Sequence, residues 1–417
     1  MNRLFTLLIV LAMAGGIAAG WWCNQHFQDP DQIKEIVGWF KVVTDVFLRL
    51  IKMIISPLVF STLVAGIAHM GDAGSVGRVG AKTMLWFITA SVISLLLGLG
   101  MVHLLQPGVG LTLPVPEASA ATVDASKFTL QDFITHVFPK SIFEAMANNE
   151  ILQIVVFSIF VGVAVASLDD KAPQVLVLVE QLAAIMLKVT GYVMRLAPLA
   201  IFAALAGTVT QYGIEILTVY AKFIGGFYLS LAVLWTTLAL AGLLFVGPRI
   251  FRLLASVWQP TLLAFGTASS EAAYPRTLEA LQKFGVSRKV ASFVLPLGYS
   301  FNLDGSMMYC TFATLFIAQI YGIEMSISQQ ITMLLLLMVT SKGMAGVPRA
   351  SLVVIAATLA YFKLPEAGLA LILAVDQVLD MGRSATNVVG NSVAAAVVAR
   401  WEGQLGPSET DAPPKAA

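Results

Sequence analysis

The sequence predicts an all-α integral membrane protein, and two observations lead to this fold class. Hydrophobic residues make up 58% of the 417 positions and charged residues only 12%, with a mean hydropathy of +0.84, unlike the composition of soluble domains. The apolar residues also gather into runs of roughly 20, long enough to cross a hydrocarbon core of about 30 Å as helices. A net charge of +1 without a basic stripe excludes a nucleic-acid-binding protein.

Six apolar runs in the first 256 residues predict membrane helices, over residues 4–22, 40–70, 81–105, 151–168, 175–205 and 216–246. The first run could instead be a secretory signal peptide. It is longer than the core of a typical signal peptide, however, and it ends in Trp21 and Trp22, an aromatic pair expected at a membrane interface. The proline-rich, polar residues 106–149 predict an extramembrane loop.

Two segments in the last third have arms too short to cross a membrane. We call them hairpin 1, residues 258–295 with a polar interruption at 267–271, and hairpin 2, residues 331–362 with an interruption at 341–348. Ten helical residues reach about 15 Å, half of the hydrocarbon core, so each segment should enter and leave on the same side. Paired interrupted segments indicate the binding site of a transporter, although two surface loops would also break the hydropathy.

Between the hairpins, a predicted span over residues 294–320 contains Asn302 and Asp304. In a continuous helix these two side chains would point to nearly opposite sides, so we expect an unwound turn, which Gly298 and Gly305 permit. Freed carbonyls beside a carboxylate form a site for a hard cation. The alternative is a polar kink without an ion, which leaves a costly intramembrane carboxylate without a function.

The last predicted span, residues 369–398, has one polar face, formed by Asp376, Asp380, Arg383, Ser384, Asn387 and Asn391. These side chains lie within an arc of roughly 100° and about 22 Å of helix. A structural ion pair is the simplest alternative, but it explains only Arg383 and one Asp. A guanidinium binds a carboxylate through two parallel hydrogen bonds, and a nearby carboxylate can bind an ammonium. This face therefore suits an acidic amino acid.

Four motifs in this region resemble the dicarboxylate/amino acid:cation symporter family, most closely its bacterial proton/glutamate symporters. In chain order, residues 269–271, 298–305, 341–348 and 380–387 are similar to the family's first hairpin tip, unwound seventh helix, second hairpin tip and eighth helix. The resemblance implies an elevator-type transporter of eight transmembrane helices plus two re-entrant hairpins, assembled as a homotrimer.

The resemblance also implies a division of the chain. Residues 1–256 would form helices 1–6, mostly a scaffold for trimerisation, with helices 3 and 6 belonging to the transport domain. Residues 257–401 would form the transport core, and residues 402–417 a disordered cytoplasmic tail.

The substrate site follows from the same resemblance. Arg383 would bind the side-chain carboxylate of glutamate or aspartate, Asp380 would bind the amino group, and Asp376 would orient Arg383. The other implied contacts are Ser270, Ser306, Ser384 and Asn387, with Gly346 and Val347 in the extracellular gate formed by hairpin 2. Family members that transport C4-dicarboxylates lack an acid at Asp380. Its presence favours amino acids over the alternative substrates succinate, fumarate and malate.

The transported cation is the only cofactor-like species that the resemblance implies. Its sites would include Gly298, Ser300, Asn302, Asp304, Ser341, Asn387 and Asn391. Sodium-coupled members have an Asp in place of Asn391, and their third-helix oxygen ligands are replaced here by Phe87 and Ala90, with Ser91 retained. These differences favour protons over sodium ions, with Glu271, Asp304 and Asp380 as proton carriers.

Two other functions agree less well with the sequence. An ion channel should show repeated selectivity rings. An intramembrane aspartic protease needs two acids that share a proton, whereas Asp376 and Asp380 face Arg383 on one helix. We therefore expect no enzymatic activity.

The positive-inside rule predicts the orientation. Arg3, Arg78, Lys82 and Arg400 should lie on the cytoplasmic side, which places both termini there. We expect a multi-pass protein of the bacterial inner membrane that contacts lipid and a small acidic substrate.

Overall fold

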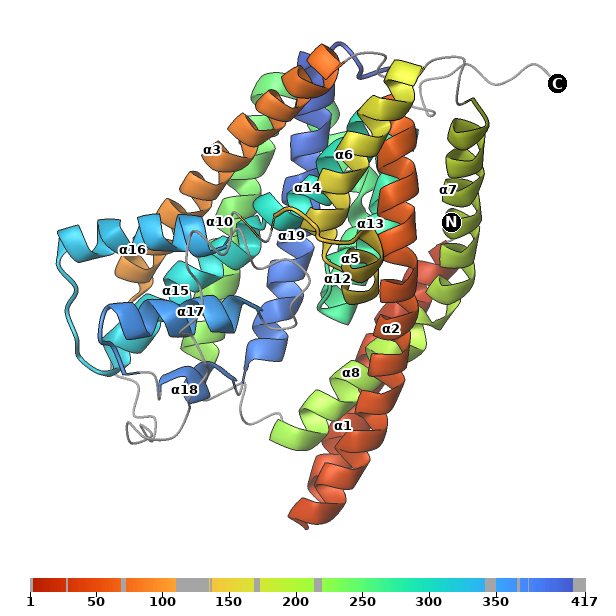
Figure 1. Ribbon diagram of the computed structural model, residues 1–417. Coiled ribbons are helices and arrows are strands. Elements are labelled where there is room, and N and C mark those ends of the chain that lie inside the picture. Colours follow the sequence, from red (N-terminus) through yellow and green to blue (C-terminus); the bar gives the residue numbers. More distant parts are fainter. Residues whose placement is uncertain are drawn as a thin grey trace.

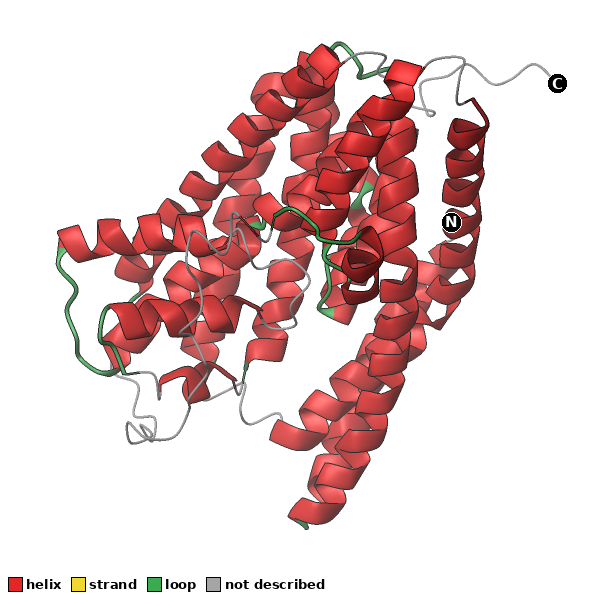
Figure 2. Cartoon of the chain, in the orientation of Figure 1, coloured by secondary structure: helices red, strands yellow, loops and turns green. Residues whose placement is uncertain are grey.

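The computed structural model describes residues 3–27, 29–68, 73–109, 135, 137–168, 173–213, 220–341, 350–365, 368–373 and 375–407. Within these residues every regular element is a helix, and the only β-type pairing is an isolated antiparallel bridge between Val286 and Leu405. Figure 2 shows this helical architecture. The predicted all-α class is confirmed.

The helices are labelled in Figure 1. In the first 256 residues they are α1 Arg3–His26, α2 Pro30–Ala68, α3 Ala73–Leu105, α5 Ile142–Asn148, α6 Ile151–Leu168, α7 Pro173–Val193, α8 Ala197–Tyr212, α10 Ala221–Val246 and α11 Arg249–Ser256. The later helices are α12 Trp258–Thr267, α13 Tyr274–Phe284, α14 Arg288–Phe301, α15 Asp304–Ile320, α16 Ile327–Thr340, α17 Ala350–Tyr361, α18 Leu369–Leu373 and α19 Asp376–Trp401.

Helices α1, α2, α7 and α8 lie together on the right of Figure 1, and α2 packs against α6, α7 and α8. The close contact of α1 with α8 depends on glycine. A Cβ atom on Gly20 would lie 2.6 Å from the carbonyl oxygen of Ala206, so a larger residue would push the two helices apart.

Helix α19 occupies the centre of the remaining helices and packs against α10, α12, α14 and α15. All its residues from Met381 to Ala399 are buried. Helices α16 and α17, the arms of hairpin 2, lie on the left of Figure 1 and run across the direction of α3 and α19. The polar face of α19 is therefore enclosed by protein rather than by lipid.

Four described helical segments are long and apolar enough to cross a membrane, namely Leu7–His26, Gly74–Leu105, Pro173–Val193 and Ala221–Val246. Large apolar side chains on them are exposed, as Leu85 on α3 and Leu244 on α10 show at 62% and 82%. Such a surface suits lipid contact.

Several element boundaries differ from those predicted. Helices α2 and α3 begin at Pro30 and Ala73 rather than at residues 40 and 81, and the expected last span 369–398 is divided into α18 and α19. The expected span 175–205 is divided by a 3₁₀ turn, Met194–Leu196, because Pro198 fits only the first turn of a new helix, and α8 continues to Tyr212. The second arm of hairpin 1 ends at Phe284, where Gly285 adopts φ +111°, so α14 begins well before residue 294. The expected loop 106–149 includes the short helix α5.

Residues 402–407 also differ from the expected disordered tail. Glu402 accepts hydrogen bonds from Lys82 at 2.5 Å and from Arg78 at 3.1 Å. The Ser287 amide donates to the Gln404 carbonyl at 3.1 Å, next to the Val286–Leu405 bridge. These contacts join the end of α19 to α3 and α14, and residues 408–417 lie outside the described part of the chain.

Candidate functional site

A buried arginine lies between two carboxylates at the start of α19. Arg383 is 1% exposed, and its Nη2 atom lies 3.2 Å from Asp376 Oδ1 and 2.9 Å from Asp380 Oδ1. Asp376 is the first residue of α19, where the helix dipole favours an acid. The ion pair that the sequence analysis kept as the simplest alternative is therefore present, with both acids as partners.

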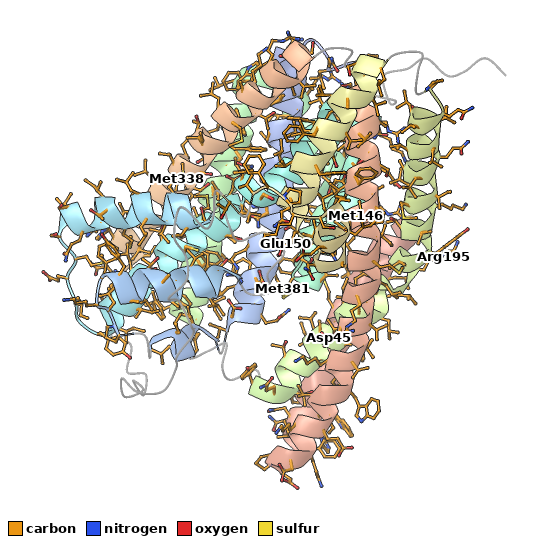
Figure 3. The ribbon with its side chains drawn as sticks, in the orientation of Figure 1. Asp45, Met146, Glu150, Arg195, Met338 and Met381 are labelled. Carbon is orange, nitrogen blue, oxygen red and sulfur yellow. The ribbon has the colours of Figure 1, made fainter. Side chains whose placement is uncertain are left out.

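The two acids differ in burial. The Asp376 side chain is 1% exposed and the Asp380 side chain is 27% exposed. Figure 3 labels Met381, the residue that follows Asp380 on α19, inside the helical assembly. Asp376 is thus a fixed internal partner of Arg383, whereas Asp380 can also reach a ligand.

Tyr309 on α15 completes the surroundings of Arg383. The guanidinium lies 4.1 Å from the centroid of the Tyr309 ring, a cation–π contact. The Tyr309 hydroxyl donates to Asp376 Oδ1 at 3.3 Å. Among the described residues, neither Nε nor Nη1 of Arg383 has a hydrogen-bond partner, although both atoms are buried. Two charged donors are therefore available to a carboxylate ligand.

Polar side chains of α15 and α19 meet one turn further along. Asn387 Oδ1 accepts from the Gly305 amide at 2.9 Å, and Asn387 Nδ2 donates to Ser306 Oγ at 3.2 Å. Ser306 and Ser384 are 8% and 5% exposed. The start of α15 and the middle of α19 thus bring together three of the predicted substrate contacts.

The tip of hairpin 1 lies between α12 and the short 3₁₀ turn Glu271–Ala273. Ser270 is 9% exposed, and α12 packs against α19. Glu271 begins the 3₁₀ turn and is half-buried. Gly346 and Val347 of the predicted gate lie outside the described residues, which end on this side of hairpin 2 at Ser341. Ser341 is buried and donates to the Met338 carbonyl at 3.3 Å.

The predicted unwound turn is present and separates α14 from α15. Helix α14 ends at Phe301, Asn302 and Leu303 have non-helical backbone angles, and α15 begins at Asp304. Asn302 and Asp304 are both fully buried. Asn302 Nδ2 bridges the two helices, because it donates to Asp304 Oδ2 at 3.0 Å and to Asn391 Oδ1 at 3.1 Å.

Two glycines make room for this cluster. A Cβ atom on Gly390 would collide with the Asp304 carboxylate, and one on Gly298 would collide with the Asn391 side chain. Ser300 is buried beside the turn, and its hydroxyl has no hydrogen-bond partner among the described residues. The predicted residues Gly298, Asn302, Asp304 and Asn391 therefore form one buried polar cluster.

The structure also adds residues that sequence reasoning missed. Ser94 Oγ on α3 lies 3.2 Å from Asp304 Oδ1, Tyr309 faces Arg383, and Trp235 Nε1 donates to Thr386 on α19 at 2.8 Å. None of these stands out in the sequence, because serine, tyrosine and tryptophan are ordinary in apolar helices. Ser94 lies four residues before Gly98, and this spacing on one helix face is the only indication that α3 approaches another helix there.

The described residues contain no group of three or more His, Cys, Asp or Glu side chains that could hold a metal ion. Any cation held at the Asp304 cluster would therefore depend on one carboxylate and neutral oxygen atoms. Such a set suits a monovalent hard cation or a proton better than a transition metal.

Comparison with known proteins places this geometry in context. The model of a family described as the sodium:dicarboxylate symporter family matches residues 5–401. A proton/sodium-glutamate symport protein from Bacillus caldotenax is 40% identical over 377 residues, 89% of each chain. A proton/glutamate-aspartate symporter from Escherichia coli (strain K12) is 40% identical over 409 residues, 94% of this chain and 92% of the relative. A C4-dicarboxylate transport protein from Cupriavidus necator is 41% identical over 412 residues, 97% of this chain and 94% of the relative.

Proposed function

Because this chain belongs to the sodium:dicarboxylate symporter family, we propose that it takes up glutamate or aspartate together with protons or sodium ions. Its relatives are named as symporters and transport proteins, not as enzymes. The observation that favours an acidic amino acid is the pairing of Arg383, which has two buried donors available, with Asp380, a carboxylate that is partly exposed.

The proposed binding mode uses these two groups separately. Nη1 of Arg383, together with Nη2 once Asp380 turns from it to the substrate, would bind the side-chain carboxylate in parallel. Asp380 would bind the substrate ammonium, and Asp376 with Tyr309 would keep the guanidinium in place. Ser270, Ser306, Ser384 and Asn387 would contact the α-carboxylate and neighbouring atoms, and the tip of hairpin 2 with Gly346 and Val347 would close the site.

Transport of C4-dicarboxylates is the second candidate function. The Cupriavidus necator relative, named as a C4-dicarboxylate transport protein, matches 97% of this chain. In addition, Asp380 lies 2.9 Å from Arg383 in the structure and could remain with it when the substrate has no amino group. The two functions differ in whether Asp380 leaves the arginine to bind an ammonium.

We place the transporter in the bacterial inner membrane as a multi-pass homotrimer with both termini in the cytoplasm. The scaffold would consist mainly of helices from residues 1–256, with α3 and α10 belonging to the transport domain. Residues 257–401 would form the transport core, which moves as an elevator relative to the scaffold. The direct contacts of α3 and α10 with α15 and α19 support their assignment to the moving part.

Uptake into proteoliposomes tests the proposal. Labelled glutamate, aspartate and succinate are supplied with an imposed pH gradient or a sodium gradient, applied separately. Accumulation of the amino acids with either gradient supports the proposed function and identifies the cation. Accumulation of succinate alone favours the second candidate, and no accumulation of any of the three with either gradient contradicts both.

A matched pair of variants tests the binding mode. Asp380→Asn should lower amino acid uptake by at least about tenfold, since a hydrogen bond to a charged group contributes about 1.5–3 kcal/mol, and should leave succinate uptake unchanged or raised. Asp376→Asn should lower uptake of both substrates, because Arg383 itself loses a buried partner. Equal losses for both substrates in Asp380→Asn would contradict the ammonium contact.

A further inference from the structure

We infer that Ser94 on α3 is an oxygen ligand of a sodium-sized cation bound at Asp304. This inference rests on the proposed cation-coupled function and adds a residue to its cation site. Sequence reasoning favoured protons partly because Phe87 and Ala90 of α3 supply no side-chain oxygen. In the structure α3 places another hydroxyl besides that of Ser91, the one of Ser94 a turn after Ala90, 3.2 Å from Asp304 Oδ1.

Close helix packing brings Ser94 to this position. A Cβ atom on Gly98 would lie 2.8 Å from the carbonyl oxygen of Met308, so α3 and α15 can approach closely only because Gly98 has no side chain. Ser94 lies one turn before Gly98, as Asp304 lies one turn before Met308. The same helix contact therefore places the Ser94 hydroxyl next to the Asp304 carboxylate, where Ser94 is fully buried.

The hydrogen-bond geometry of Ser94 leaves an oxygen lone pair for an ion. Its Oγ lies 2.8 Å from the Ala90 carbonyl oxygen and 3.2 Å from Asp304 Oδ1. A hydroxyl has one hydrogen to donate, and the closer Ala90 carbonyl of the same helix can accept it. Ser94 Oγ and Asp304 Oδ1 would then face each other as two electron-rich oxygens. That arrangement is favourable with a cation between them.

The spacing suits one ion. Hard cations of the size of Ca²⁺ lie about 2.3–2.6 Å from their oxygen ligands, so two oxygens 3.2 Å apart can bind the same ion as adjacent ligands. A third oxygen, Asn302 Oδ1, is buried in the same cluster and has no hydrogen-bond partner among the described residues. A buried acceptor beside a carboxylate is a group that a bound cation would satisfy.

The experiment compares the sodium dependence of the wild-type protein with Ser94→Ala, Ser94→Thr and Thr83→Val. Thr83→Val is the matched control, because Thr83 is also buried on α3 but, among the described residues, its hydroxyl bonds only to Val79 of its own helix, at 2.8 Å. Thermal unfolding of the full-length purified protein is followed while NaCl replaces choline chloride at constant ionic strength. Sodium-driven glutamate uptake into proteoliposomes is the second readout.

We expect sodium to stabilise the wild-type protein by binding the folded state. Ser94→Ala should need about tenfold more sodium for half of the effect in both readouts, which corresponds to about 1.4 kcal/mol. Ser94→Thr, which keeps the hydroxyl, and Thr83→Val should stay close to wild type. An unchanged sodium dependence in Ser94→Ala, an equal shift in Thr83→Val, or a wild-type protein that does not respond to sodium would each overturn the inference.

The outcomes separate this inference from the proposed function. A wild-type protein that accumulates glutamate with a pH gradient but shows no response to sodium would retain the proposed function and refute the role of Ser94. If sodium stabilised the protein through Ser94 but none of the acidic substrates were transported, the role of Ser94 would stand and the proposed function would be refuted.

Discussion

Replacing Gly390 by Ala should displace the carboxylate of Asp304 from its buried cluster. A Cβ atom at position 390 would collide with Asp304 Oδ2 and lie 3.0 Å from its Cγ. Neither helix can easily move, because Gly390 and Asp304 are both in fully buried parts of α19 and α15. The carboxylate would have to rotate away from Asn302, which donates to it at 3.0 Å.

The expected cost follows from three contributions. Overpacking a core costs about 1–3 kcal/mol, and a lost hydrogen bond to a charged group about 1.5–3 kcal/mol. Alanine in place of glycine stabilises a helix by about 1 kcal/mol. Gly390→Ala should therefore destabilise the folded protein by about 1.5–5 kcal/mol, opposite in sign to the helix-propensity effect alone.

Thermal unfolding of the purified variant, together with cation-driven uptake, measures both consequences. Gly225→Ala is the matched control, since a Cβ atom there on α10 would meet nothing within 4 Å, and it should unfold at the wild-type temperature or above. If Gly390→Ala were as stable as wild type and transported with the same cation dependence, the Asp304 cluster described here would be wrong.

Three further changes test other contacts. Arg383→Lys should lower kcat/KM for glutamate by roughly 100-fold, because an ammonium cannot form two parallel bonds to a carboxylate, and unchanged uptake would refute the pocket. Tyr309→Phe keeps the ring over Arg383 but loses the hydroxyl bond to Asp376, so uptake should fall by about five- to tenfold. Tyr309→Leu also loses the ring and should lower uptake further. Equal losses of uptake in the two variants would contradict the cation–π contact. Burial by itself would raise the pKa of Glu402. The hydrogen bonds and charges of Lys82 and Arg78 have a larger effect and hold that pKa below its ordinary value of 4.5. The stabilisation from Glu402 is therefore present above pH about 4.5 and lost as the pH falls through the lower folded-state pKa. In Glu402→Gln the thermal stability should therefore fall less steeply at acid pH. An identical pH profile of the unfolding temperature in wild type and Glu402→Gln would refute this role of Glu402.

The sequence indicated much of the site because its residues follow one another on single helices. Asp376, Asp380 and Arg383 lie on one face of a helix by the 100° rotation per residue, and the structure joins them in ion pairs. The break at Asn302 was predictable for a similar reason, since two buried polar side chains two residues apart cannot share a face of a continuous helix. Local geometry also separated hairpin arms from full spans by length alone.

Features that depend on contacts between distant helices could not be predicted in this way. Hydropathy does not show that Pro198 begins a new helix, because the apolar run continues through the 3₁₀ turn before it. It also does not show that residues 402–407 are ordered, because their partners Lys82 and Ser287 lie far away along the chain.

The sequence by itself determined the membrane character of the chain, the polar face of its last helix and the unwound turn, all of which are properties of neighbouring residues. Only the tertiary structure decided which side chains complete the site. Ser94 reaches Asp304 and Tyr309 covers Arg383 because α3, α15 and α19 pack closely at glycines. The distance between two packed helices depends on the small residues of both. The sequence of one helix therefore does not show which side chains of its neighbour will contact it.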